Sequence, residues 1–247
     1  MPKPRHLKRA PIVEAVVDIR ARLPQSFEPT WLNPLADRLK SVFPTSAVQH
    51  KGRVTLNLAA GAKPPAMEDL GTSGIVLHSA DRLLAAQLHL DGIALHRLSP
   101  YTSWTAIQPC ALQVWNEYVS VANPEAVTRL GLRYINRIEL PSPPGPLDQY
   151  LTSPPTAPPD FPPIITAFFN RITTTDPKRG CSAHITHAID TSPASGLPIL
   201  YVDIDVFRQG EWTPRSNEIE AMLEQLHGFK NELFFSLLTE TLIARYE

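Results

Sequence analysis

Ten of the 26 prolines in this 247-residue chain lie between Pro141 and Pro163, and this cluster limits the fold more than any other feature of the sequence. Each proline ring removes a backbone donor and restricts the preceding residue to extended conformations, so no long helix or central strand can cross this stretch. The cluster separates residues 1–140 from residues 164–247. Residues 141–163 can be a linker between two domains, or they can be an ordered crossover on the surface of a single domain.

Hydrophobic periodicity predicts strands and helices on both sides of the cluster. Residues 12–22 alternate between apolar and charged side chains, which is typical of a strand with one buried face. Further strands are expected at 48–58, 75–79, 83–90, 92–98, 127–140, 181–189 and 197–207. Helices are expected after Thr30 and after Ser103, which can cap them, and from about Thr213 almost to residue 247.

The order of these elements predicts the fold class. Strands follow one another in runs and do not alternate with helices, so we expect an α+β fold with mostly antiparallel sheet covered by helices. Residues 12–98 and 127–207 each open with a long charged strand and later add a hairpin. This similarity suggests two related halves, although no residue-level repeat accompanies it.

The charge balance narrows the classes of function. Twenty-three basic and 24 acidic side chains give a formal net charge of −1, which argues against a nucleic-acid-binding protein. No apolar run approaches the roughly 18 residues that span a bilayer, and residues 1–9 lack the apolar region of a signal peptide. Cys110 and Cys181 have no partner at metal-ligand spacing, so they are expected to be reduced thiols in a cytoplasmic protein.

The strand expected at 127–140 carries three arginines on one face. A period of two places Arg129, Arg133 and Arg137 on the same side, where they would repel one another unless they are matched by acidic groups. The candidate partners are carboxylates on two other expected strands: Glu14, Asp18, Asp203 and Asp205.

Three interpretations of these arginines and carboxylates remain open. They can cancel one another as ion pairs across neighbouring strands, or they can form a protein interface. Alternatively, Arg133 and Arg137 can bind the phosphate or carboxylate of a ligand, with the carboxylates as acid/base groups. Asp203 and Asp205 also have the spacing at which two carboxylates share a divalent cation, but they belong to no complete metal motif.

The sequence contains no catalytic motif that we recognise. It has no G-x-S-x-G, HExxH or C-x-x-C pattern, no P-loop and no G-x-G-x-x-G. We therefore expect neither a cofactor nor a resident metal.

The helix expected at the C-terminal end has apolar residues on more than one side. Phe234, Phe235, Leu238 and Leu242 contribute to this wide apolar surface. A helix buried in the core explains such a surface, and so does self-association as a symmetric homodimer.

Four segments together resemble an uncharacterised, sporadically distributed bacterial family of about this length. They are residues 10–20, Tyr101 and Trp104 ahead of Trp115, the Leu-Arg-Tyr-Ile-Asn-Arg-Ile strand at 132–138, and Phe-Phe-Ser-Leu-Leu at 234–238. The resemblance covers the chain from end to end. It implies an accessory gene of the kind found on mobile elements or in conflict systems, and it implies no activity.

Two functional hypotheses follow from the sequence. The first is a non-enzymatic binding or interaction protein that forms a homodimer, with a further protein as its partner. The alternative is an enzyme or ligand-binding protein that acts on a phosphorylated or carboxylated small molecule at the face formed by Arg129, Arg133 and Arg137.

Overall fold

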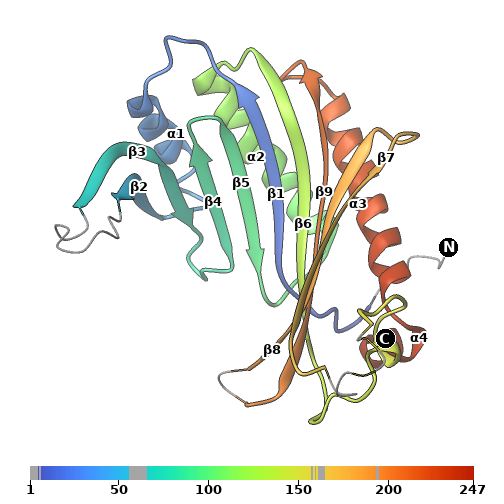
Figure 1. The fold of residues 1–247 in the computed structure, drawn as a ribbon. Helices are drawn as coiled ribbons and strands as arrows, with labels where there is room; N and C mark the ends of the chain where they lie inside the picture. Colours follow the sequence, from blue (N-terminus) through green and yellow to red (C-terminus); the bar gives the residue numbers. More distant parts are fainter. Residues whose placement is uncertain are drawn as a thin grey trace.

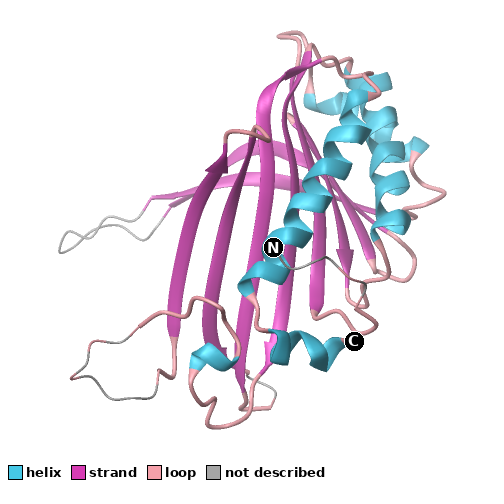
Figure 2. Ribbon diagram, turned by 90° about the vertical axis from the view of Figure 1, so that its right-hand side faces the viewer, coloured by secondary structure: helices cyan, strands magenta, loops and turns pink. Residues whose placement is uncertain are grey.

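The computed structural model describes residues 5, 7–55, 66–156, 158, 160, 165–192 and 195–247. Within these residues nine strands form one antiparallel sheet, and the long helices lie on one of its faces (Figures 1 and 2). The expected α+β class with an antiparallel sheet is confirmed. The strands are β1 (Ile12–Arg22), β2 (Thr45–Thr55), β3 (Ala66–His78), β4 (Leu84–His89), β5 (Gly92–Leu98), β6 (Ala126–Glu139), β7 (Phe168–Asp176), β8 (Cys181–Thr191) and β9 (Pro198–Trp212). The α-helices are α1 (Leu32–Arg38), α2 (Trp104–Ala122), α3 (Glu218–Leu237) and α4 (Glu240–Ile243).

The strand order is β2-β3-β4-β5-β1-β6-β9-β8-β7. The central strands β1 and β6 pair with each other in antiparallel fashion. On its other side, β1 pairs with β5 and β6 pairs with β9. Pairing between β6 and β9 extends from Val127↔Trp212 to Glu139↔Ile199. The strands before and after the proline cluster therefore belong to one continuous sheet.

The helices cover the face of the sheet to which the apolar residues of β1 point. Ala15, Val17 and Ile19 are almost completely buried there, whereas Asp18 and Arg20 lie on the opposite, open face. Helix α2 packs on β1 and β5, and helix α3 packs on β6 and β9. The main core therefore lies between the sheet and these two helices.

Of the two predicted helix caps, one is present in the structure and the other is not. Ser103 caps α2 as predicted, because its hydroxyl accepts a hydrogen bond from the amide of Ala106. Thr30 does not cap α1, so that prediction is wrong. Pro29 begins a short 3₁₀ turn (Pro29–Trp31) that includes Thr30, and α1 starts after it.

Strand β7 has no counterpart among the expected strands. It forms one edge of the sheet, and its side chains are largely exposed on both faces, including 73% of Phe169 and 48% of Ile172. Because most side chains of β7 are exposed, neither face of this strand has to be apolar along its length. The alternation that reveals a half-buried strand is therefore missing from its sequence.

The described part of the proline cluster packs against the C-terminal end of the chain. Leu147, Tyr150 and Leu151 are buried, and Leu151 forms an antiparallel bridge with Leu238 just after α3. The Tyr150 hydroxyl donates to the carbonyl of Pro144 at 2.7 Å. These contacts order residues 141–156, whereas the division of the chain into domains at 141–163 stays a prediction.

Candidate functional site

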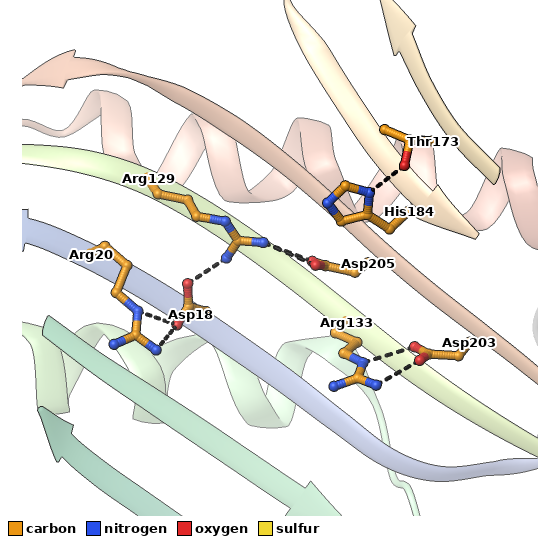
Figure 3. A network of polar contacts seen from close by, with 8 residues as sticks. All are labelled: Asp18, Arg20, Arg129, Arg133, Thr173, His184, Asp203 and Asp205. Atoms are coloured by element: carbon orange, nitrogen blue, oxygen red, sulfur yellow. Dashed lines mark hydrogen bonds and ion pairs between the residues drawn. The ribbon is translucent and has the colours of Figure 1, made fainter. Parts of the chain in front are cut away.

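The open face of the sheet carries ion pairs among five of the seven charged residues identified in the sequence, which are Asp18, Arg129, Arg133, Asp203 and Asp205 (Figure 3). Arg129 on β6 donates to Asp18 on β1. It also donates to the two carboxylate oxygens of Asp205 on β9, and both of these bonds are 3.0 Å long. Arg133 donates to Asp203 through two bonds, at 2.9 and 2.6 Å. Since each guanidinium already has carboxylate partners, these residues form cross-strand ion pairs in this structure.

Arg129 is the most enclosed arginine of this group. Its side chain is 22% exposed, against 50% for Arg133, and its guanidinium lies over the Phe207 ring at 4.9 Å. A Cβ built on Gly131 would overlap the Arg129 guanidinium, so glycine at this position lets the side chain lie flat on the sheet. Burial raises the pKa of Asp205, although Arg129 opposes the shift.

Arg137 and Glu14 make contacts separate from these ion pairs. Arg137 donates to Glu139 at 2.9 Å and to the Ser192 hydroxyl at 3.3 Å, and Glu14 accepts a hydrogen bond from Nδ1 of His96 at 2.7 Å. The three arginines therefore do not converge on one anion.

A hollow of about 280 Å³ lies on the open face beside Arg133. Its lining residues are Arg133, Phe169, Arg171, His184, Thr186, Asp203 and Asp205. The two carboxylates balance the two guanidiniums, so the hollow has no surplus of positive charge that would favour an anionic ligand.

The four C-terminal residues considered for a dimer interface lie inside the protomer. Phe234, Phe235, Leu238 and Leu242 are at most 7% exposed and belong to the main core. Their apolar surface is used in packing within the chain and offers no exposed patch.

A cavity of about 360 Å³ lies on the helix-covered side of the sheet, and the sequence analysis did not identify it. It is enclosed by the N-terminal segment before β1, the start of α2, strand β6 and helix α3. The residues of interest in its wall are Tyr101, Ser103, Trp104, Tyr134, Asn136, His227, Lys230 and Asn231. The cavity therefore combines aromatic walls with several polar groups.

Lys230 is the most unusual residue of this wall because it is a lysine with only 6% of its surface exposed. Its ammonium nitrogen donates to Asn231 at 2.6 Å and lies 3.8 Å from the centre of the Tyr134 ring. No carboxylate of the described residues forms an ion pair with it. Burial lowers the pKa of Lys230 to about 7, so a large part of the amine is neutral near pH 7.

The other polar groups of the wall form a chain of contacts along α3. The Trp104 indole donates to Glu224 at 2.5 Å, and Glu224 lies 3.8 Å from Nδ1 of His227. His227 stacks on Trp104 and lies 3.4 Å from Asn231, which accepts from Lys230. Burial and the nearby Lys230 lower the pKa of His227 to about 4, so this imidazole is neutral near pH 7.

Strand β6 supplies a tyrosine and an asparagine to the same cavity. Tyr134 is 2% exposed and contacts the Tyr101 ring edge-to-face, with the ring centroids 5.7 Å apart. Asn136 is 1% exposed and donates to the carbonyl of Val202 at 2.9 Å, but its Oδ1 has no hydrogen-bond partner in the described structure.

One signal in the sequence could have identified Lys230. The lysine lies four residues after Leu226 and four before Phe234, which puts it on the apolar stripe of α3. A lysine within such a stripe is buried, unless its stem reaches solvent.

Comparisons of the chain with protein families, curated proteins and solved structures found no match. The residues that the structure describes contain no group of three or more His, Cys, Asp and Glu side chains that could hold a metal ion. None of the described helices is long and apolar enough to span a membrane. The fold and the cavity together define an α+β protein that has an aromatic cavity with a buried lysine in its wall.

The exposed ion pair of Arg133 is expected to contribute little to stability. Replacing Arg133 with methionine should lower the free energy of unfolding by less than about 1 kcal/mol, because solvent screens a half-exposed pair. Urea unfolding would measure the change. A loss of several kcal/mol would show that Arg133 has a larger structural role than its exposure indicates.

Proposed function

We propose that the protein binds a small organic molecule in the cavity, with a carboxylate or carbonyl oxygen of the ligand directed at Lys230. The observation that carries the proposal is the buried amine of Lys230 in the cavity wall, without a carboxylate partner among the described residues. A buried cation normally has such a partner, and a ligand oxygen would supply it.

The size and the walls of the cavity agree with this class of ligand. A volume of about 360 Å³ is within the usual range of small-molecule sites. Trp104, Tyr134 and Phe234 provide apolar surface for a flat ring. Ser103 and Thr102 at the start of α2 add hydroxyls and the positive end of the helix dipole.

Binding of simple aromatic carboxylates tests this proposal. We expect benzoate, phenylacetate or a larger aryl carboxylate to raise the melting temperature of the wild type, and the shift should increase with the ligand concentration. The Lys178→Met variant, which removes an exposed lysine, should respond like the wild type, and Lys230→Met should not respond. Equal responses of all three proteins would place binding elsewhere and contradict the proposal.

The alternative site at the arginine face has weaker support. Arg129 and Arg133 already have carboxylate partners there, and a ligand anion would have to displace Asp203 or Asp205. The cavity needs no such exchange.

We also propose that the protein forms a homodimer through the edge strand β7. The strand is nine residues long and contains no proline, and Phe169 and Ile172 are its most exposed apolar side chains. An uncovered edge of this kind is suited to antiparallel pairing with a second copy, which would extend the sheet across a twofold axis.

The replacement of Ile172 with lysine tests this dimer. Light scattering should give a dimer for the wild type and a monomer for Ile172→Lys, because a charge at the paired edge opposes pairing. Phe235→Leu is a control that keeps the edge unchanged and should remain a dimer. A wild-type protein that stays monomeric at high concentration would exclude the edge-to-edge dimer.

Two broader expectations stay proposals with structural support. Counted from the sheet centre, the strand order is β1-β5-β4-β3-β2 in the first half and β6-β9-β8-β7 in the second, and a covering helix follows each half. This similar order supports two related halves, the first with one additional edge strand. Free thiols at Cys110 and Cys181 agree with a cytoplasmic protein, where thiols stay reduced.

A further inference from the structure

The amine of Lys230 has surroundings that favour reaction as well as binding. It lies in the wall of a cavity with space for a small molecule, and it is covered by the ring of Tyr134 at 3.8 Å. Among the described residues, its nitrogen donates a hydrogen bond to the neutral amide of Asn231. A lysine amine in such an apolar, uncompensated site is a nucleophile towards carbonyl carbon.

We propose that Lys230 forms an imine with an aldehyde or ketone that enters the cavity. The inference rests on the proposed function, because the carbonyl compound must first bind there. It narrows the ligand class from molecules with a carboxylate or carbonyl oxygen to those with an electrophilic carbonyl group.

The titratable groups around Lys230 keep its amine available. His227 on α3 is neutral near pH 7, and burial raises the pKa of Tyr134 on β6 and of Tyr101 before α2, so both phenols stay protonated. Glu224 on α3 has a side chain that is 59% exposed, and it is held by the Trp104 indole. The N-terminal segment adds Arg5 and Lys8 to the lining of the cavity, and Arg5 is paired with Glu240 and Glu247.

The proposed reaction is a condensation without any change of oxidation state. The lone pair of the Lys230 nitrogen attacks the carbonyl carbon, and a proton moves from nitrogen to oxygen to give a carbinolamine. The second nitrogen proton then leaves with the hydroxyl group as water, and a carbon–nitrogen double bond remains. Tyr101 and Tyr134 line the same cavity and are protonated, so either phenol can donate to the oxygen as it leaves.

Reductive trapping tests the inference on the intact chain. The protein is incubated near pH 7 with 4-formylbenzoate and cyanoborohydride, which reduces an imine to a stable secondary amine, and the modified lysines are located by peptide mass spectrometry. We expect Lys230 to be modified at least about tenfold faster than the exposed Lys178, because only Lys230 lies in a cavity that binds the aldehyde beside a desolvated amine. Lys230→Met should lose this fast modification, and Lys178→Met should keep it.

A parallel measurement with terephthalate separates the two proposals. Terephthalate has nearly the shape of the aldehyde and cannot form an imine, so its binding to the wild type reports on the cavity alone. If terephthalate binds and Lys230 is trapped no faster than Lys178, the imine is excluded and the binding function stands. If neither compound binds or reacts at Lys230, the proposed function fails as well.

Discussion

Replacing Lys230 with methionine is expected to stabilise the protein at pH 7 by roughly 1–3 kcal/mol while it removes ligand binding. Methionine fills a similar volume with apolar atoms, and it removes an amine whose charged form is disfavoured by burial. The lost hydrogen bond to Asn231 and the lost contact with the Tyr134 ring reduce the gain. Stability is gained at the expense of function, as is common where a site holds a poorly solvated group.

The pH dependence of this stabilisation gives the sharper test. The pKa of Lys230 is about 7 in the folded chain and near its ordinary value of 10.5 when unfolded. The destabilisation caused by the lysine is therefore complete below pH 7 and disappears as the pH rises towards 10.5. The advantage of Lys230→Met in urea unfolding should shrink between pH 7 and pH 9.5.

Lys178→Met serves as the control for this experiment, because Lys178 is exposed in a turn and its replacement should leave stability within about 0.5 kcal/mol at both pH values. If Lys230→Met destabilised the protein equally at both pH values, the lysine would be a structural element of the fold. Lys230 would then not be a binding group that the fold holds at a cost in stability.

Replacing Arg129 with methionine is expected to have the largest destabilising effect, roughly 2–4 kcal/mol. Arg129 holds Asp18 and Asp205 together, and these carboxylates are only 16% and 24% exposed. Without the guanidinium both remain on the same face of the sheet, poorly solvated and of like charge. Urea unfolding of the variant beside Arg133→Met would separate this enclosed cluster from the exposed pair.

The loss caused by Arg129→Met should depend on pH in a defined direction. Burial already raises the pKa of Asp205 in the wild type, and removal of Arg129 raises it further. When the pKa of a carboxyl group is higher in the folded than in the unfolded state, the folded protein loses stability as the pH rises from the unfolded pKa towards the folded pKa. The destabilisation should therefore be greater at pH 7 than at pH 4, and a loss that is independent of pH would indicate a packing defect instead.

The sequence predicted the central elements of the fold and failed at their margins. Strand β1 was located at 12–22 because its buried face demands an alternation of apolar and charged residues, and Ser103 was identified as the cap of α2. Strand β7 was missed because its edge position imposes no such demand. Thr30 was misassigned because local capping preferences do not reveal that Pro29 starts a turn before α1.

The sequence predicts the residues of one candidate site but not those of the other. The ion pairs of Arg129 with Asp18 and Asp205 follow from residue spacing on strands, once the strands are known to be neighbours. The cavity around Lys230 is made by the start of α2, the middle of β6, the interior of α3 and residues before β1. No local pattern predicts that four distant segments leave a space between them, so this site required the three-dimensional structure.

The N-terminal segment that lines the cavity also contacts the C-terminal end of the chain. Arg5 forms ion pairs with Glu240 and with Glu247, and the backbone amide of Arg9 donates to the carbonyl of Tyr246 at 3.1 Å. Arg5 and Arg9 therefore contact residues that lie more than two hundred positions later in the sequence. The wall of the cavity on this side depends on contacts between segments from opposite ends of the sheet-forming chain, and not on its neighbours in sequence.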